Sequence, residues 1–230
     1  MFQSLKTKDI LYIEIKEKII TGILEPDTPV VEDILAEEFE VSRTPLREAL
    51  QRLELEGWLV RRRNGRLKVS SISVSEVIEI FQVRGRLEGL VASEAAKRAT
   101  EDEIKELEMI TNLIVNAAEQ DQRSDVVRFG SEFHSLLYKI SKHKTATKML
   151  AQLNDHINRY RRLGPIRNSK RGVSAANEHQ QIFEFLARRD YENCGRAMEM
   201  HIINSMNSAA QSIEEYLHSR QLNELEEDRE

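Results

Sequence analysis

The sequence predicts a mainly α-helical protein of two parts, a winged helix-turn-helix domain followed by an all-helical bundle. Helix-forming residues dominate its 230 residues, which include only four prolines and nine glycines. Helical patterns at 9–21, 32–39 and 41–57 precede a hairpin pattern, which is the element order of a winged helix-turn-helix. From residue 76 to 219 the pattern is helical almost throughout. An all-β fold and a disordered chain are therefore excluded.

The third helical pattern, VSRTPLREALQRLELEGW at residues 41–58, is amphipathic. Four apolar residues recur at the spacing of one helix face and predict a buried side: Leu46, Ala49, Leu50 and Leu53. The opposite side offers three cations: Arg43, Arg47 and Arg52. Ser42 is placed to cap this helix, and Gly57 is placed to end it.

A basic hairpin is predicted directly after this helix. In WLVRRRNGRLKVS, at residues 58–70, the turn signal Asn64-Gly65 lies between two apolar runs. Residues 41–70 hold eight Lys or Arg against three Asp or Glu, although the whole chain has a net charge of −5. A basic surface confined to one region favours directed contact with DNA over indiscriminate nucleic-acid binding.

A polar, β-branched stretch, VSSISVS at residues 69–75, separates the hairpin from the helical run. We therefore expect a DNA-binding domain at residues 1–72, a helical domain at 73–220 and a charged, disordered tail at 221–230. Breaks in the helical pattern divide the second domain into six helices of about 15 to 25 residues. These breaks lie near Thr100, 121–124, 143–145, 163–173 and 189–190.

Three histidines of the second domain lie in phase with apolar residues of their helices: His134, His179 and His201. This phase predicts that all three face inwards. Separations of 45 and 22 residues exclude a chelate within one helix, so a shared site would need three helices of a bundle. Two interpretations stay open, hydrogen-bonded core histidines and metal ligands.

The sequence also indicates the cellular compartment in which the protein is expected. The chain has no run of roughly 20 apolar residues that would cross a bilayer, and its first residues lack the apolar segment of a signal peptide. The single Cys194 cannot form an internal disulfide and is expected to be a small buried residue. We therefore expect a cytoplasmic protein without a membrane partner.

The segment VSRTPLREALQRLELEGW resembles the DNA-binding signature of the GntR family of bacterial transcription regulators, over about residues 8–70. The resemblance implies arginine contacts to bases in the major groove, hydroxyl side chains near phosphates and a wing that reaches the minor groove. The expected DNA contacts are Ser42, Arg43, Thr44, Arg47, Arg52, Arg62, Arg63, Gly65 and Arg66. Many members of the family carry another Arg in the second helix, where this chain has Glu32 and Asp33. For any single arginine, the alternative is a solvated helix face.

Three further segments, VRGRLEGLVASEAAKRA, GSEFHSLLYKIS and NEHQQIFEFLARRDYENCGRAMEMH, resemble the all-helical FCD effector domain of the FadR subfamily. Many such domains hold Zn or Ni with one Asp and three His and bind a small organic acid beside the metal. The three histidine positions match His134, His179 and His201, whereas the aspartate position is Gly130. The resemblance therefore implies either a three-histidine centre, completed by water or effector, or a site that has lost its metal.

An effector carboxylate needs cations, and three arginines are candidates to bind it: Arg84, Arg159 and Arg162. Arg84 matches a recurrent arginine of the resembled domain. Its alternative role is an ion pair with Glu88, four residues later on the same helix.

These observations favour a homodimeric transcription regulator, most often a repressor in the resembled family, that binds a palindromic operator and responds to a small organic-acid effector. Two other functions stay open. One is a metal-dependent enzyme with a three-histidine centre, which lacks a general acid or base because position 130 is glycine. The other is an architectural protein that binds DNA without sequence choice, against which the net negative charge argues.

Overall fold

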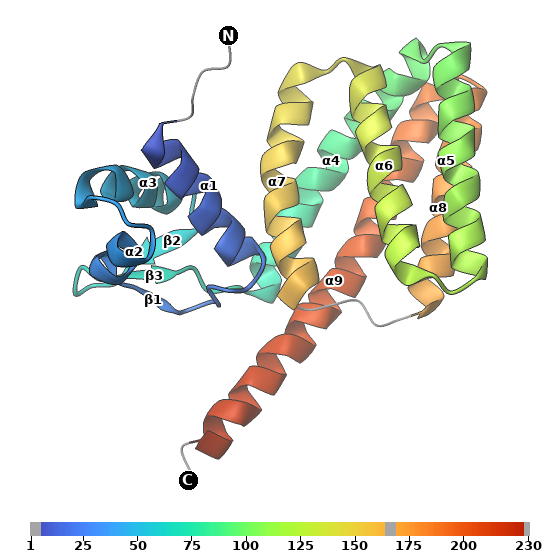
Figure 1. The fold of residues 1–230 in the computed structure, drawn as a ribbon. Coiled ribbons are helices and arrows are strands. Elements are labelled where there is room, and N and C mark those ends of the chain that lie inside the picture. Colours follow the sequence, from blue (N-terminus) through green and yellow to red (C-terminus); the bar gives the residue numbers. More distant parts are fainter. Residues whose placement is uncertain (1–5, 164–168, 228–230) are drawn as a thin grey trace. The chain divides into compact units, whose positions relative to one another are not determined.

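The computed structural model describes residues 6–163 and 169–227 (Figure 1). Two compact units divide the chain, the first made of Met1–Ser73 with Asn158–Leu163 and the second of Val74–Ile157 with Gly164–Glu230. Helix dominates the described residues, which confirms the predicted mainly α class. Within this part of the chain, no helix combines the length and the apolar character that crossing a membrane requires.

The first unit contains the predicted three helices and hairpin, together with one additional short strand. Its elements are α1 (Thr7–Ile20), β1 (Pro29–Val30), α2 (Glu32–Glu38), α3 (Arg43–Leu55), β2 (Leu59–Arg61) and β3 (Leu67–Val69). The strands form an antiparallel sheet in the order β1-β3-β2. No sequence pattern predicts β1, because a two-residue strand is too short to show alternation.

The helix α3 begins and ends where the sequence predicts. Ser42 occupies the N-cap position, but its side chain makes no capping hydrogen bond, so the expected side-chain cap is wrong. At the other end, Gly57 has a φ of +80°. The Trp58 N–H donates to the Leu53 carbonyl (2.9 Å), and the Gly57 N–H donates to the Glu54 carbonyl (3.1 Å). This Schellman ending requires a left-handed residue, which glycine provides without strain.

A single apolar core holds α3 in the first unit. All four residues predicted on its inner side are buried: Leu46, Ala49, Leu50 and Leu53. They belong to one cluster with residues of α1 and the hairpin, which include Leu11, Ile15, Ile19, Trp58, Leu59 and Val69. Because this packing fixes the inner side of α3, the polar side of the helix faces solvent.

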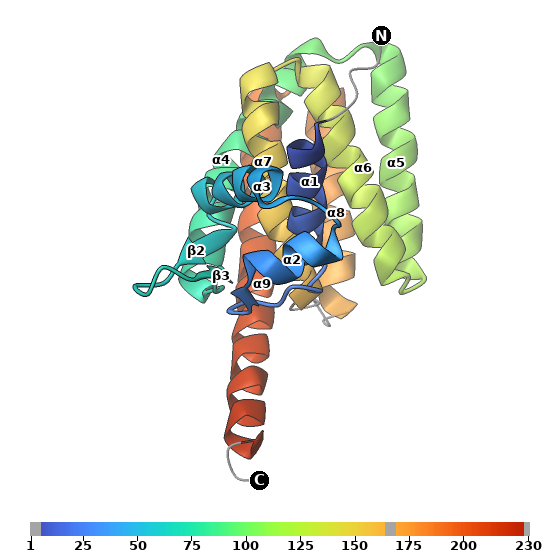
Figure 2. The ribbon, with the colours of Figure 1, turned by 60° about the vertical axis from the view of Figure 1, so that its left-hand side comes forward.

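The second unit is built from long helices (Figures 1 and 2). They are α4 (Val74–Arg98), α5 (Glu101–Glu119), α6 (Arg123–Ser141), α7 (Lys144–Leu163), α8 (Ser169–Ala187) and α9 (Tyr191–Glu227). The last residues of α7 are grouped with the first unit. Thr100 begins α5 with a capping box, in which its hydroxyl and the Glu103 carboxylate each accept from the other's backbone N–H.

Two expectations for this region need correction. The helix α9 is 37 residues long and continues to Glu227, so residues 221–227 are helical and their expected disorder is wrong. Residues 228–230 lie outside the described part of the chain. The expected break at 163–173 is also too long, because α8 already begins at Ser169, whereas residues 164–168 lie outside the described residues.

The helices α4 and α9 cross at a pair of glycines. A Cβ atom on Gly89 would lie 2.9 Å from the Gly195 carbonyl oxygen, and one on Gly195 would lie 3.0 Å from the Gly89 carbonyl oxygen. Larger residues would therefore push the two backbones apart. Cys194 is buried beside this crossing, as expected, and its thiol donates to the Ala92 carbonyl (3.6 Å).

Candidate functional site

The exposed side of α3 presents two arginines that are each paired with a carboxylate of α2. Arg43 Nη2 lies 2.8 Å from Asp33 Oδ1, and Arg47 Nε lies 2.7 Å from Glu32 Oε2. The hydrogen bond and the charge of Glu32 raise the pKa of Arg47 above its ordinary value. Both arginine side chains are more than half exposed. The α3 surface therefore offers two charged planar groups, which suit guanine edges and phosphates.

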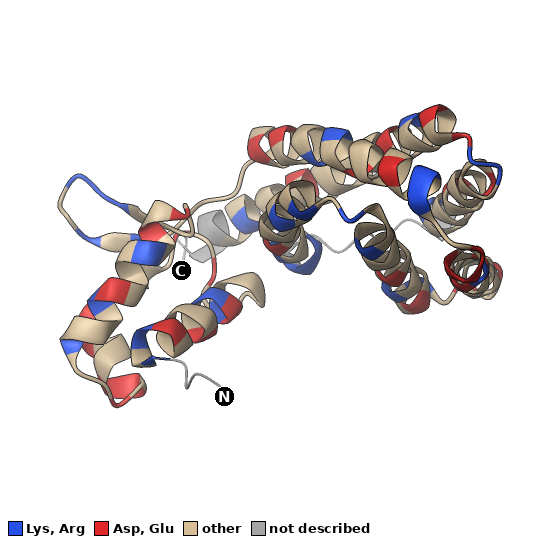
Figure 3. Cartoon of the chain, turned by 90° about the horizontal axis from the view of Figure 1, so that it is seen from above, with Lys and Arg blue, Asp and Glu red and all other residues tan. Residues whose placement is uncertain are grey.

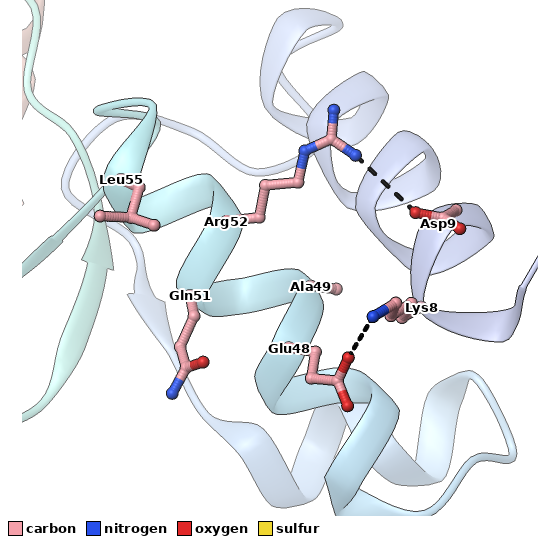
Figure 4. A pocket seen from close by; sticks show the side chains of 7 residues that line it. All are labelled: Lys8, Asp9, Glu48, Ala49, Gln51, Arg52 and Leu55. Atoms are coloured by element: carbon pink, nitrogen blue, oxygen red, sulfur yellow. Dashed lines mark hydrogen bonds and ion pairs between the residues drawn. The ribbon is translucent and has the colours of Figure 1, made fainter.

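Arg52 lies in a different environment on the same helix. Its guanidinium carbon is 3.6 Å from the centroid of the Tyr12 ring, and its Nε donates to Glu56 Oε1 (3.1 Å). It faces Asp9 across a pocket between α1 and α3 (Figure 4). The pocket is lined by Lys8, Asp9, Glu48, Ala49, Gln51, Arg52 and Leu55. These contacts hold α3 against α1, so Arg52 has a structural task besides its predicted contact with DNA.

The hairpin between β2 and β3 carries a basic tip (Figure 3). Its predicted contact residues are all exposed: Arg62, Arg63, Gly65 and Arg66. The Arg62 N–H donates to the Arg66 carbonyl (2.9 Å), and Gly65 has a φ of +81°. No sequence pattern singles out Arg61, which donates to the Glu54 carboxylate through Nε (3.0 Å) and Nη2 (2.7 Å). This bidentate pair joins the hairpin to α3.

The second unit brings together the three histidines that sequence spacing alone could not place. His134 comes from α6, His179 from α8 and His201 from α9, and all three are buried. One ring nitrogen of each lies within 4.8 Å of those of the other two. The His179 and His201 rings are closest, with centroids 4.4 Å apart. Three imidazoles at this spacing can bind one metal ion.

Hydrogen bonds orient all three imidazoles in the same way, because each Nδ1 faces an oxygen acceptor. The pairs are His134 with Glu88 Oε2 (3.0 Å), His179 with the Ala175 carbonyl (2.7 Å) and His201 with Glu178 Oε2 (2.6 Å). Since carboxylates and carbonyls only accept, Nδ1 of a neutral ring carries the proton and Nε2 keeps its lone pair. The Nε2 atom of His179 is buried without a hydrogen-bond partner. This donor set fits a divalent metal ion, which would bind that nitrogen.

Glu88 supports the first of these imidazoles from α4. Its carboxylate is completely buried and accepts hydrogen bonds from Arg84 Nε (3.1 Å) and the Tyr138 hydroxyl (2.6 Å). Burial raises the pKa of Glu88, but the charges of His134 and Arg84 and the hydrogen bonds outweigh it and lower the pKa to about 2. Glu88 is therefore an ionised partner of His134. The only sequence signal for it is its spacing of four residues from Arg84.

Glu178 supports His201 in the same way. It accepts from Arg171 Nη2 (2.8 Å) and the Asn204 side-chain amide (2.9 Å). Burial raises the pKa of Glu178, but hydrogen bonds to His201 and Arg171 lower it to about 2. Burial, in turn, lowers the pKa of His201 to about 4. No sequence pattern identifies Glu178, because its partner His201 lies on another helix.

Position 130 faces the histidine cluster. A Cβ atom on Gly130 would lie 3.5 Å from both Cε1 and Nε2 of His179, which is ordinary van der Waals contact. The buried ring of His179 has a pKa well below its usual value, chiefly because of burial and secondarily because of the neighbouring histidines. Its neutral form can donate Nε2 to a metal. Glycine supplies no side-chain ligand here.

The three arginines expected to bind an effector lie in different places. Arg84 is buried in α4 and pairs with Glu88, which is the alternative role foreseen from their spacing. Arg159 donates to the Ser70 hydroxyl (3.0 Å), and Arg162 donates to the Thr21 carbonyl (3.2 Å). These last two arginines and their acceptors belong to the first unit. Of these three arginines, Arg84 is the one whose described hydrogen bonds lead to the histidine cluster, through Glu88.

Comparison with known proteins matches both units. Residues 7–83 match the bacterial regulatory proteins of the gntR family, and residues 79–204 match the FCD domain. The HTH-type transcriptional regulator YdhC of Bacillus subtilis is 28% identical over 210 residues, covering 90% of each chain. The HTH-type transcriptional repressor RspR of Escherichia coli is 28% identical over 205 residues, covering 89% of this chain and 90% of RspR.

A solved structure shows the same fold. McbR/YncC of E. coli superposes with a TM-score of 0.69 at 20% identity, covering 91% of this chain and 100% of that one. The family and these relatives are transcription regulators, which confirms the predicted class and excludes the enzyme alternative. The chain belongs to the GntR family of bacterial transcription regulators, with an FCD domain following its DNA-binding domain.

Proposed function

We propose that this DNA-binding regulator represses transcription from a palindromic operator as a homodimer, and that a small organic acid bound in the FCD domain controls its affinity for DNA. One of its relatives is named as a repressor, which supports this direction of regulation. A two-fold protein presents two copies of α3 to two equivalent half-sites. Because its partner is chromosomal DNA, we place the protein in the cytoplasm.

In this proposal, α3 enters the major groove with Arg43 and Arg47 directed at base edges. Ser42 and Thr44, at the start of the same helix, lie near phosphates, where helix N-termini favour negative charge. The wing contributes Arg62, Arg63 and Arg66 on one exposed turn. The exposure and charge of these side chains support the assignment, because phosphate contacts give affinity and bidentate arginine contacts give sequence preference.

The histidine cluster holds a divalent metal, zinc or nickel, through the Nε2 atoms of His134, His179 and His201. The observation that carries this proposal is the common orientation of the rings. Each Nδ1 is engaged by an acceptor, while the buried Nε2 of His179 has no hydrogen-bond partner. A bound metal would supply a Lewis-acidic coordination position for a carboxylate ligand.

Gly130 determines where the effector binds. The family places an aspartate at this position, and the structure shows that a side chain here would contact His179. We assign the position next to Gly130 to the effector, whose carboxylate replaces the missing ligand. Arg84 then acts as a positioning residue, because its guanidinium holds Glu88, which holds His134. Arg159 and Arg162 are poorer candidates for the carboxylate, since their hydrogen bonds lie in the first unit.

Selection of binding sites from a random DNA pool by the full-length protein tests the first half of the proposal. We expect an inverted repeat to be enriched, and a single half-site or no enrichment would contradict it. Thermal unfolding with zinc or nickel, alone and with a panel of hydroxy acids, dicarboxylates and sugar acids, tests the second half. Stabilisation by an acid should require the metal, because ligand that binds the folded state raises the unfolding temperature by mass action. Stabilisation that is unchanged in chelator would contradict metal-linked binding.

A further inference from the structure

The DNA-facing arginines of this protein are not free cations before DNA arrives. Glu32 and Asp33 are consecutive residues in the first turn of α2, and each pairs with a different arginine of α3. The Arg47–Glu32 and Arg43–Asp33 distances are 2.7 and 2.8 Å. Figure 3 shows acidic and basic segments interleaved over this unit. The two guanidinium groups are therefore already ion-paired with carboxylate oxygens and must leave them to bind phosphate oxygens.

Resting on the proposed contact of α3 with DNA, we infer that Glu32 and Asp33 compete with DNA phosphates for Arg43 and Arg47 and so weaken binding to DNA of the wrong sequence. On random DNA an arginine exchanges one anionic partner, a carboxylate, for another, a phosphate, and gains little. On the operator, a guanine edge offers two acceptors in the plane of the guanidinium. The cost of leaving the carboxylate is the same on both DNAs, but only the base contacts of the operator repay it, so binding to random DNA stays weak.

The salt dependence of binding follows from the same exchange. A free arginine that reaches a phosphate releases about one counterion from DNA, which makes log K fall with log salt concentration. An arginine that first leaves a carboxylate exposes a new anion, and this anion takes up a cation from solution. Each carboxylate pair therefore removes up to about one unit from the salt slope.

A double variant of the full-length protein, Glu32→Gln with Asp33→Asn, removes both charges and preserves side-chain size. We expect it to bind a random-sequence duplex about three- to tenfold more tightly than wild type, with a salt slope steeper by about one to two units. Fluorescence anisotropy at several salt concentrations measures both. The matched control is Glu14→Gln with Glu17→Gln, two exposed carboxylates of α1 that make no ion pair with Arg43 or Arg47.

The control variant has the same gain of net charge, so it reports the general electrostatic effect. The inference requires a larger effect at Glu32 and Asp33 than in the control. It also requires this excess to disappear when both variants are made in an Arg43→Ala, Arg47→Ala background, because Glu32 and Asp33 then have no arginine of α3 to pair with. Equal effects of the two double variants, or an excess that persists without the arginines, would overturn it. Weaker binding of the Gln/Asn variant to random DNA, with an unchanged unfolding temperature, would also overturn it.

Discussion

Replacing Gly130 by Asp should turn the three-histidine cluster into a four-ligand metal site. A Cβ atom at this position would lie 3.5 Å from the Nε2 of His179, so the carboxylate of an aspartate would come within reach of a metal bound to that nitrogen. An anionic ligand in place of water should tighten zinc binding by about 100-fold, or about 2.7 kcal/mol. Separately, zinc at a concentration about 100 times its dissociation constant should stabilise the folded protein by about 2.7 kcal/mol through mass action.

The assay is competition for zinc between the protein and a chromophoric chelator, combined with thermal unfolding in the presence and absence of zinc. Gly130→Ala is the matched control. It removes the flexibility of a helical glycine, which should add about 0.5 to 1 kcal/mol to the free energy of unfolding, but it supplies no ligand. The aspartate variant should therefore show the larger zinc-dependent stabilisation, and the alanine variant should bind zinc as wild type does.

Equal zinc affinity of the aspartate and alanine variants would refute the proposed placement of position 130 in the coordination shell. The effector provides a second criterion. If its carboxylate occupies the space beside Gly130, the Asp variant should lose acid-dependent stabilisation while it retains metal. Retention of the acid response in the Asp variant would place the effector elsewhere.

Three other predictions concern α3 and the packing of the second unit. Arg47→Ala should weaken binding to selected operator DNA by about 1 to 3 kcal/mol in fluorescence anisotropy, and equal weakening on random DNA would show that Arg47 contacts only phosphate. Gly195→Val should reduce the free energy of unfolding by about 1 to 3 kcal/mol or more in a urea titration, because its Cβ would lie 3.0 Å from the Gly89 carbonyl oxygen. An unchanged urea midpoint would contradict the close crossing. Burial and the charge of Asp190 raise the pKa of Cys194 to about 12. The thiol should therefore react with an aromatic disulfide reagent only on unfolding. Rapid reaction of the native protein would contradict its burial.

The winged helix-turn-helix could be predicted from local patterns because its signals lie within single elements. The buried residues of α3 follow from 3.6-residue spacing, and Gly57 marks the end of that helix through its φ of +80°. The basic hairpin follows from Asn64-Gly65 between apolar runs. The attachment of the hairpin to α3 could not be predicted from the sequence. It depends on the Arg61–Glu54 ion pair, which forms only at the observed angle between the two elements.

The histidine cluster could be predicted only in part. Helical phase places His134, His179 and His201 on inner faces, and the family resemblance places them in one site. The orientation of the rings depends on Glu88 and Glu178, which come from other helices than the imidazoles they contact. Such partners become visible only when the packing of the helices is known. For the same reason, the sequence could not show that Arg159 and Arg162 bond to Ser70 and Thr21.

The acidic residues of α2 show another limit of sequence patterns. Glu32 and Asp33 stand where a family arginine is common, so the pattern marks a departure without indicating its consequence. The structure supplies the missing information by bringing these carboxylates within 2.8 Å of Arg43 and Arg47. The two acidic residues thereby engage both arginines of α3 that are proposed to contact DNA.

Three histidines of the FCD domain are proposed to form one metal site in this DNA-binding regulator. Calorimetric titration of chelator-stripped, full-length protein with zinc chloride tests it most directly. We expect one zinc ion per chain for wild type, and a large loss of affinity for His179→Ala and for His201→Ala, each shown to be folded by circular dichroism. Absence of zinc binding by folded wild-type protein, or unchanged affinity and stoichiometry in the histidine variants, would contradict it.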